Sequence, residues 1–214
     1  MRFPTLALLL AASAFGQAAP AIENDSVRVP VAHQQPHART PLHQHPFNRV
    51  MIYLQSGSEL FTYPNKPPAT LNFKAGEVEW SPAGGMHTAE IVSPHPVTIV
   101  EIELKKPGAK LSATGPLDPV VVDPKHYQVE FENDQVRVLR VRIGPHESTP
   151  VHKHALNRVV TYVTDQDFRV TSADGKVERV QHKAGEVTWS GPATHKEENL
   201  SGHPFEVLVA ELKY

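Results

Sequence analysis

The chain contains the pattern His-x-His twice, and each copy is followed two residues later by Asn-Arg-Val. The copies are His43/His45 and His152/His154, 109 residues apart. The same offset aligns Glu-Asn-Asp at 23–25 with 132–134, and Lys-Ala-Gly-Glu-Val at 74–78 with 183–187. Self-similarity at a fixed spacing indicates one structural unit built more than once. The sequence is therefore interpreted as an internal duplication, which restricts the fold to two similar units.

Both copies consist of short stretches in which apolar and polar residues alternate, the pattern of a half-buried strand. The clearest stretches are 27–29, 49–54, 97–104, 136–141, 158–163 and 205–212. Asp174-Gly175 predicts a two-residue hairpin turn, and Asn65-Lys66 predicts a turn at the aligned position of the first copy. No stretch of ten residues repeats its apolar side chains at helical spacing, so the sequence predicts an all-β sandwich or barrel.

The first residues have the features of a secretory signal peptide. The basic start Met1-Arg2 precedes an apolar run over 6–14, and small residues follow. That run is too short to span a membrane. We therefore expect a signal peptide at 1–19 and a periplasmic or secreted protein. A first unit at 20–106, a linker rich in proline and glycine at 107–126 and a second unit at 127–214 complete the predicted organisation.

Charge and cysteine content narrow the classes of partner. The formal net charge is −2 and no long basic run is present, so nucleic acid and anionic membranes are poor partners. The chain has no cysteine, which leaves histidine and carboxylate as metal ligands. We expect a small-molecule substrate or ligand, and a homodimer is a compatible assembly.

Three histidines recur in each copy. His43 and His45 lie two apart in a predicted strand, so both point to one face. A third ligand must come from another strand. The pattern G-x5-P-x-G-x2-H from Gly76 to His87 predicts a tight hairpin that delivers His87. The second copy supplies His152, His154 and His195. We expect each triad to bind a divalent transition metal (Fe, Mn, Zn, Cu or Ni); the alternative is a polar interior that binds none.

His-x-His followed about forty residues later by this glycine-proline motif resembles the two motifs of the cupin superfamily, and the duplication resembles a bicupin. The resemblance implies two tandem cupin barrels of the jelly-roll (double-stranded β-helix) type. The second copy departs from the pattern because Gly185 to His195 is one residue shorter, although it has the family's asparagine as Asn199. The usual ligand glutamate is absent from both copies, where Arg49 and Arg158 stand. The resemblance therefore implies a three-histidine site with an arginine close by.

Arg49 and Arg158 are the candidate catalytic residues, with two roles open. Either arginine could bind a substrate carboxylate or phosphate. Either could instead form an internal ion pair, with Glu103 and Glu211 as the aligned partners. The internal pair is narrowly favoured because an arginine inside a small barrel must be paired.

The leading function is a metal-dependent enzyme acting on a small molecule, with dioxygenation first and decarboxylation or isomerisation second. A non-enzymatic binding protein for a small molecule or metal is the alternative, and a structural protein is third. We expect the first barrel to be the main small-molecule site, because charges over 196–199 should crowd the mouth of the second. No general base is identified among Glu79, Glu90 and Glu101.

Overall fold

The computed structural model describes residues 19–214, so the predicted signal peptide falls almost entirely outside the described residues. The described chain is all-β apart from one four-residue helix, α1 (Pro119–Val122). The strands before that helix are β1 (Ile22–Glu23), β2 (Val27–Val29), β3 (Val31–Gln34), β4 (His43–His45), β5 (Asn48–Tyr53), β6 (Gly57–Thr62), β7 (Ala69–Phe73), β8 (Glu77–Ser81), β9 (Gly84–Ile91) and β10 (Val97–Leu104). Those after it are β11 (Tyr127–Glu132), β12 (Val136–Ile143), β13 (His152–His154), β14 (Arg158–Tyr162), β15 (Gln166–Ser172), β16 (Val177–His182), β17 (Val187–Ser190), β18 (Ala193–Asn199) and β19 (Phe205–Leu212).

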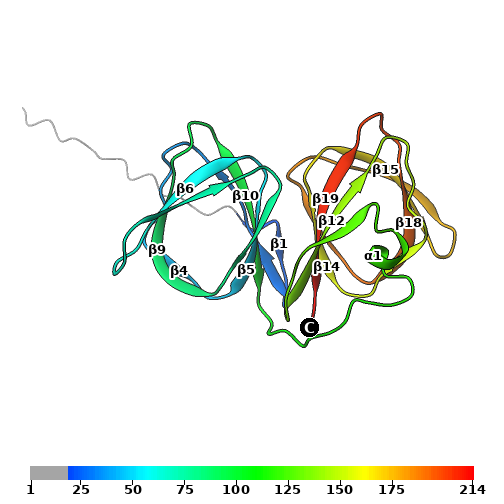
Figure 1. The fold of residues 1–214 in the computed structure, drawn as a ribbon, viewed down its shortest axis with the longest axis horizontal. Helices are drawn as coiled ribbons and strands as arrows, with labels where there is room; N and C mark the ends of the chain where they lie inside the picture. The colour runs from blue at the N-terminus through cyan, green and yellow to red at the C-terminus, as the bar shows by residue number, and fades with distance from the viewer. Residues whose placement is uncertain (1–18) are drawn as a thin grey trace, which may run out of the picture.

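Each half of the chain contains two antiparallel sheets. In the N-terminal half the orders are β1-β2-β10-β5-β8, with β3 also paired to β10, and β4-β9-β6-β7. In the C-terminal half they are β11-β12-β19-β14-β17 and β13-β18-β15-β16. Figure 1 shows the strands of each half curving round a central space. The chain is thus all-β with several antiparallel sheets, as the alternating stretches predicted.

The predicted strands and turns lie close to the observed ones. The stretches 97–104 and 205–212 are β10 and β19, and 49–54 and 158–163 match β5 and β14 to within a residue. The Asp174-Gly175 hairpin joins β15 to β16, but its loop has four residues rather than two. Asp174 accepts hydrogen bonds from the Ser172 hydroxyl and the Lys176 amide, and Gly175 has φ +84°. The left-handed conformation at Gly175 closes the loop without a Cβ clash.

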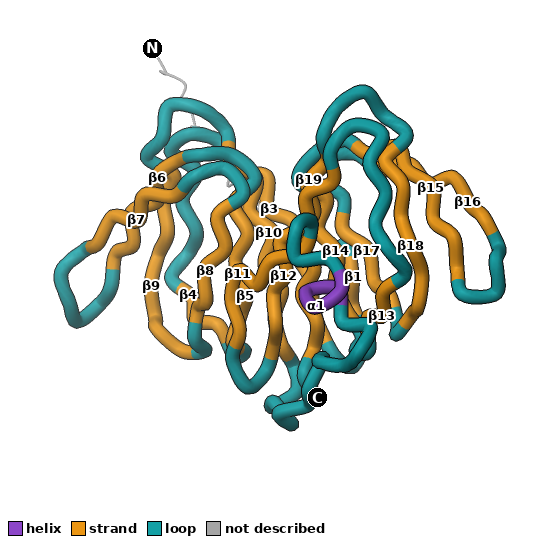
Figure 2. The backbone as a smooth tube through the Cα atoms, turned by 45° about the vertical axis from the view of Figure 1, so that its right-hand side comes forward, coloured by secondary structure: helices purple, strands orange, loops and turns teal. Residues whose placement is uncertain are grey.

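One hydrophobic core joins the two halves. It contains Val50, Ile52, Val100 and Ile102 of the N-terminal half and Val138, Val159, Leu208 and Ala210 of the C-terminal half, among others. Trp80 and Trp189, which are partly buried, pack against it. Figure 2 shows the central strands of the two halves side by side. The large sheets therefore pack against each other through their outer faces.

Alternation along β5 sends the remaining side chains inward. Met51 and Tyr53 belong to a separate core inside the N-terminal half, and Arg49 shares their side of the strand. The C-terminal half has its own inner core around Leu139, Val141 and Phe168. Both faces of the large sheets are buried, which is why five of the six residues of β5 are buried.

The connection between the halves is ordered by a few contacts. Residues 105–118 have no strand, and Asp118 then caps α1 by accepting a hydrogen bond from the Val120 amide at 3.0 Å. A Cβ on Gly108 would lie 2.2 Å from the Asp134 carbonyl oxygen, so only glycine fits there. Within the described residues, no helix is long and apolar enough to cross a membrane.

The shared core predicts that the two halves unfold together. Leu208 is fully buried in this core. Leu208→Ala should therefore lower the free energy of unfolding by about 2–5 kcal/mol, in a single calorimetric transition that includes both halves. Leu111→Ala is the matched control, because Leu111 is 42% exposed. Two separate transitions, with only one shifted in the Leu208 variant, would contradict the shared core.

Candidate metal centres and the adjoining cavity

The C-terminal triad is built by two neighbouring strands. β13 pairs with β18 so that His152 lies directly opposite His195, and His154 lies opposite Ala193. Because side chains alternate along a strand, His152 and His154 share a face, and His195 reaches that face from β18. One ligand nitrogen from each of the three histidines lies within 4.8 Å of the others. The sequence prediction that these histidines come together is confirmed.

The N-terminal triad has the same plan with one irregularity. His43 of β4 lies opposite His87 of β9, but His45 lies opposite Gly84 after a register shift. Gly84 and Gly85 have φ of +100° and +69°. This is where the first copy has its extra residue, which is accommodated as a bulge. The ligand atoms of His43, His45 and His87 again lie within 4.8 Å of one another.

Backbone carbonyl groups orient three of the six rings. The Nδ1 atoms of His43, His87 and His152 donate to the carbonyl oxygens of residues 41, 85 and 150 at 2.8, 2.7 and 3.0 Å. A carbonyl only accepts, so Nδ1 carries the proton and Nε2 keeps its lone pair. That tautomer leaves Nε2 of each of these rings able to bind a metal.

Three of the rings, His195, His154 and His45, are also held neutral. Burial lowers the pKa of His195 to about 4 and, with the charge of Arg158, lowers that of His154 far below its ordinary value. Burial and the charge of Arg49 lower the pKa of His45 to about 3. Neutral imidazole is the form that binds a metal.

A chain of buried charges orients His154. Its Nδ1 donates to Glu211 at 2.8 Å, Glu211 accepts from Arg137 at 2.7 Å, and Arg137 also donates to Asp118 at 2.7 Å. All four side chains are at most 4% exposed. A carboxylate on the outer nitrogen of a histidine fixes the ring and raises its basicity toward a metal. The linker residue Asp118 is therefore connected to the C-terminal triad.

The corresponding histidine of the N-terminal half has a different neighbour. Arg49 Nη1 lies 2.7 Å from Nδ1 and 2.8 Å from Nε2 of His45. The same guanidinium donates to Glu101 at 2.6 Å and to Ser81 at 2.8 Å. Arg49 thus forms an internal ion pair, as expected. The prediction that Glu103 is its partner was wrong, because the partner is Glu101. Glu103 lies opposite Arg28 as well as Arg49, and its ion pair is with Arg28 at 3.7 Å.

The predicted pair between Arg158 and Glu211 was also wrong. Glu211 lies opposite both Arg137 and Arg158, and its carboxylate binds Arg137 and His154 instead. Arg158 donates to the Gly191 carbonyl oxygen. Among the described residues, no carboxylate lies within ion-pair distance of Arg158, and burial lowers the pKa of its guanidinium.

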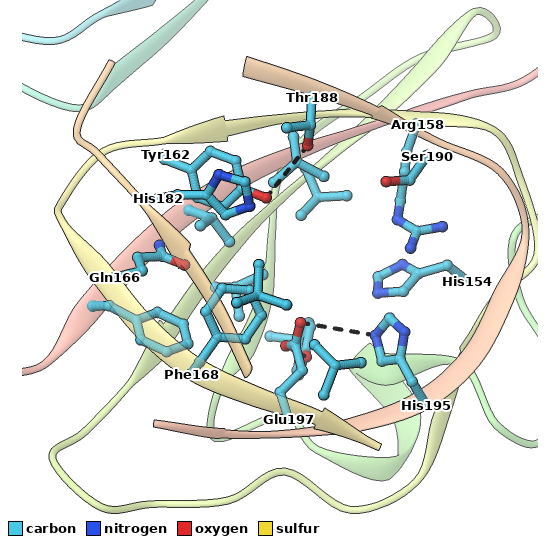
Figure 3. Close-up of a pocket in the computed structure, with 18 residues that line it drawn as sticks. His154, Arg158, Tyr162, Gln166, Phe168, His182, Thr188, Ser190, His195 and Glu197 are labelled. Atoms are coloured by element: carbon cyan, nitrogen blue, oxygen red, sulfur yellow. Dashed lines mark hydrogen bonds and ion pairs between the residues drawn. The ribbon is translucent and has the colours of Figure 1, made fainter. Parts of the chain in front are cut away.

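A cavity of about 340 Å³ lies beside the C-terminal triad. Figure 3 shows Arg158, His154 and His195 along one side and Tyr162, His182, Gln166 and Phe168 along the other. Its size falls within the range of small-molecule sites. The loop comparison favoured the first barrel as the main small-molecule site, whereas this cavity is in the second half.

Glu197 enters this cavity and was missed in the sequence. Tyr127 donates to its carboxylate at 3.0 Å, and the carboxylate lies 3.9 Å from Nε2 of His195. The expectation that charges over 196–199 crowd the mouth was therefore wrong for Glu197, which lines the interior. The uncharged Asn199 is fully buried and donates to three backbone carbonyls. Alternation in β18 places Glu197 and Asn199 on the face of His195, a signal that the sequence already contained.

The N-terminal half has an acidic interior. Glu59, Glu79 and Glu101 influence one another there, and Tyr53 donates to Glu79 at 3.2 Å. Burial, reinforced by the charge of Glu101, raises the pKa of Glu59 to about 7. The corresponding residues of the C-terminal half are Phe168, Thr188 and Val209. The two interiors thus differ in charge although their strand orders match.

Comparison with known proteins defines the fold. No protein-family model matches the sequence. No curated protein matches it either. Similar solved structures include AerE from Microcystis aeruginosa, with TM-score 0.64, 13% identity and coverage of 87% of this chain and 88% of that chain. Oxalate decarboxylase from Bacillus subtilis at pH 4.6 has TM-score 0.60, 14% identity and coverage of 87% and 68%. A cupin domain from Bordetella pertussis Tohama I matches 41% of this chain at TM-score 0.39.

These likenesses show the fold alone, because every identity is below 25%. The chain is all-β with sheets that agree with the cupin, or jelly-roll, fold.

The ion pair inside the N-terminal half predicts energetic coupling between Arg49 and Glu101. Arg49→Ala leaves the partly buried Glu101 carboxylate, 19% exposed, without its partner and should lower the free energy of unfolding by up to about 3–5 kcal/mol. In a double-mutant cycle Arg49→Ala and Glu101→Ala should couple by about 1–3 kcal/mol. Arg49→Ala with Glu103→Ala is the matched comparison, and equal or larger coupling there would contradict the observed pairing.

The raised pKa of Glu59 predicts a specific pH dependence of stability. Glu59 titrates near 4.5 when unfolded and at about 7 when folded. Between these values the unfolded chain ionises first, so a rise in pH from about 5 to 7 destabilises the folded state. Glu59→Gln should remove this loss, on the order of 2–3 kcal/mol. Denaturant unfolding across that range measures it, with the exposed Glu178→Gln as control; identical slopes for both variants and the parent would contradict it.

Proposed function

We propose that the C-terminal half binds one divalent transition metal through His152, His154 and His195, and that the protein is a metal-dependent enzyme for a small molecule. The proposal rests on the position of this triad, because His154 and His195 line the cavity. Nε2 of His195 is buried and has no hydrogen-bond partner. A metal ion would satisfy that atom. The Nδ1 contacts of His152 and His154 leave their Nε2 atoms directed to the same ion, and Nε2 of His152 also lies 3.1 Å from the Tyr127 hydroxyl, which a bound metal would replace as its partner.

The C-terminal triad is the stronger candidate of the two. His154 has a carboxylate on its outer nitrogen, whereas His45 has a guanidinium within 2.8 Å of both ring nitrogens. A positive group opposes a cation at close range. The charge of Arg158 also acts on His154, but its hydrogen bond is to the Gly191 carbonyl oxygen and not to that ring. The N-terminal triad remains a candidate for a weaker site, since His43 Nε2 and His45 Nε2 are 3.0 Å apart. Two ligands at right angles about 2.1 Å from one ion have about that separation.

The metal, when bound, would supply Lewis-acid or redox chemistry at its open coordination positions. Three imidazoles suit iron, copper, zinc or nickel. The Mn(II) centres of the Bacillus subtilis oxalate decarboxylase add manganese to the metals to test. Arg158 would bind and orient an anionic group of the substrate, and Phe168 would exclude water from the far side.

Dioxygenation is the first reaction to test. Decarboxylation or isomerisation is the second, and Glu197 favours it because its carboxylate, hydrogen-bonded to Tyr127, can accept or return a substrate proton beside the triad. A non-enzymatic binding protein is the alternative if the loaded protein turns over no substrate.

The organisation of the chain is part of the proposal. The two halves have matching strand orders, β2-β10-β5-β8 with β12-β19-β14-β17 and β4-β9-β6-β7 with β13-β18-β15-β16. This supports two tandem cupin barrels that arose by internal duplication, joined by a linker over 107–126. Export to the periplasm or medium is proposed from the apolar run over 6–14 alone.

Metal stoichiometry tests the proposed centre. The mature protein loaded with Mn(II) or Zn(II) and dialysed should keep one tightly bound equivalent by elemental analysis. His195→Ala should lose it because the triad is broken, while His87→Ala should keep it and the exposed His203→Ala should match the parent. Retention in His195→Ala together with loss in His87→Ala would place the tight site in the wrong half. Oxygen uptake and product analysis with phenols and small carboxylic acids then separate enzyme from binder.

A further inference from the structure

The two aligned arginines have different surroundings. Arg49 has an internal carboxylate partner, Glu101, two residues before Glu103 on β10. The residue two before Glu211 on β19 is Val209, which has no charge. The C-terminal half has therefore lost the partner that neutralises the arginine in the N-terminal half.

The charges of Glu197 and Glu211 act on Arg158, but among the described residues neither carboxylate lies within ion-pair distance of its guanidinium. Glu211 is engaged by Arg137 and His154. The other carboxylate of the cavity, Glu197, accepts from Tyr127 and lies next to His195. Arg158 is only 6% exposed and lines the cavity, and Figure 3 shows its guanidinium beside the His154 ring. A buried guanidinium with several free donors strongly favours an anion, and a carboxylate matches its planar fork.

The opposite part of the cavity is suited to an apolar group. Phe168, Val170 and Val180 contribute to its lining, and Phe168 stands where the N-terminal half has Glu59. The polar groups nearby have partners of their own: Tyr162 stacks on His182 and bonds to Thr188, and Gln166 donates to the Glu206 carbonyl. A ligand that reaches this side therefore needs few hydrogen-bonding groups there.

Charge and volume limit the ligand further. Glu197 carries a negative charge in the same cavity, so a second carboxylate on the ligand would be repelled. A volume of about 340 Å³ is roughly eleven times the volume of one water molecule in the liquid, about 30 Å³. This matches an organic anion of about ten non-hydrogen atoms.

We propose that the C-terminal cavity binds a small monocarboxylate with an apolar body, its carboxylate held by Arg158 and its body against Phe168. The assignment deepens the proposed function by naming the substrate class, and it predicts that dicarboxylates are poor ligands. The N-terminal half, with Arg49 neutralised by Glu101 and an acidic interior, does not bind such anions.

Calorimetric titration of the full mature protein tests this, with phenylacetate as the probe. Phenylacetamide has the same shape without the charge, and phenylmalonate adds a second carboxylate. Each titration is done with metal-free protein and with metal-loaded protein. Phenylacetate should bind at least tenfold more tightly than either comparison compound. Arg158→Gln should abolish that preference, whereas Arg142→Gln, which removes a charge from outside the cavity, should retain it.

A second variant tests the missing partner directly. Val209→Glu restores the carboxylate that Arg49 has, so it should remove the preference for phenylacetate while Arg158 is still present. Thermal unfolding confirms that each variant is folded. Equal affinity for phenylacetate and phenylacetamide, or an unchanged preference in Arg158→Gln, would overturn the proposal. If the triad binds no metal but the protein still prefers phenylacetate, the anion site is supported and the metal centre is rejected. If the triad binds metal but the protein shows no preference for phenylacetate, the metal centre is supported and the anion site is rejected.

Discussion

The shared core between the two halves is the constraint on which the rest of the structure depends. Val50 and Ile52 of the N-terminal half are buried in that core, and so are Val159 and Leu208 of the C-terminal half. A strand has a two-residue period, so the residues between them must point into the half to which they belong. An arginine in such a position cannot reach bulk solvent. Each half must therefore supply a counter-charge for its arginine or leave it for a ligand.

The two halves meet this requirement in different ways. In the N-terminal half Glu101 binds Arg49, and the guanidinium also lies against His45. In the C-terminal half the charges are arranged outward from the triad, from His154 through Glu211 and Arg137 to Asp118. That arrangement orients a histidine for a metal and leaves Arg158 facing the cavity. At one aligned position the first half has Glu101 and the second half has Val209. That single difference accounts for much of the difference in proposed function.

Much of this could be predicted from the sequence. The alternation of apolar and polar residues located the main strands. The spacing of the histidines predicted that His43, His45 and His87 come together, and likewise the second triad, because each triad depends only on the period of one strand and on one hairpin. The partner of Arg49 could not be predicted, since β10 lies between β2 and β5 and Glu103 faces an arginine on each side. Glu197 could have been found from its parity with His195.

The position of a bound metal tests the central claim most directly. Anomalous X-ray diffraction from crystals of the mature protein grown with Mn(II) or Zn(II) locates the ion without any assumption about the reaction. We predict a strong peak about 2.0–2.2 Å from Nε2 of His152, His154 and His195, with a weaker peak or none at the N-terminal triad. A peak at His43, His45 and His87 with none at the C-terminal triad would contradict the account.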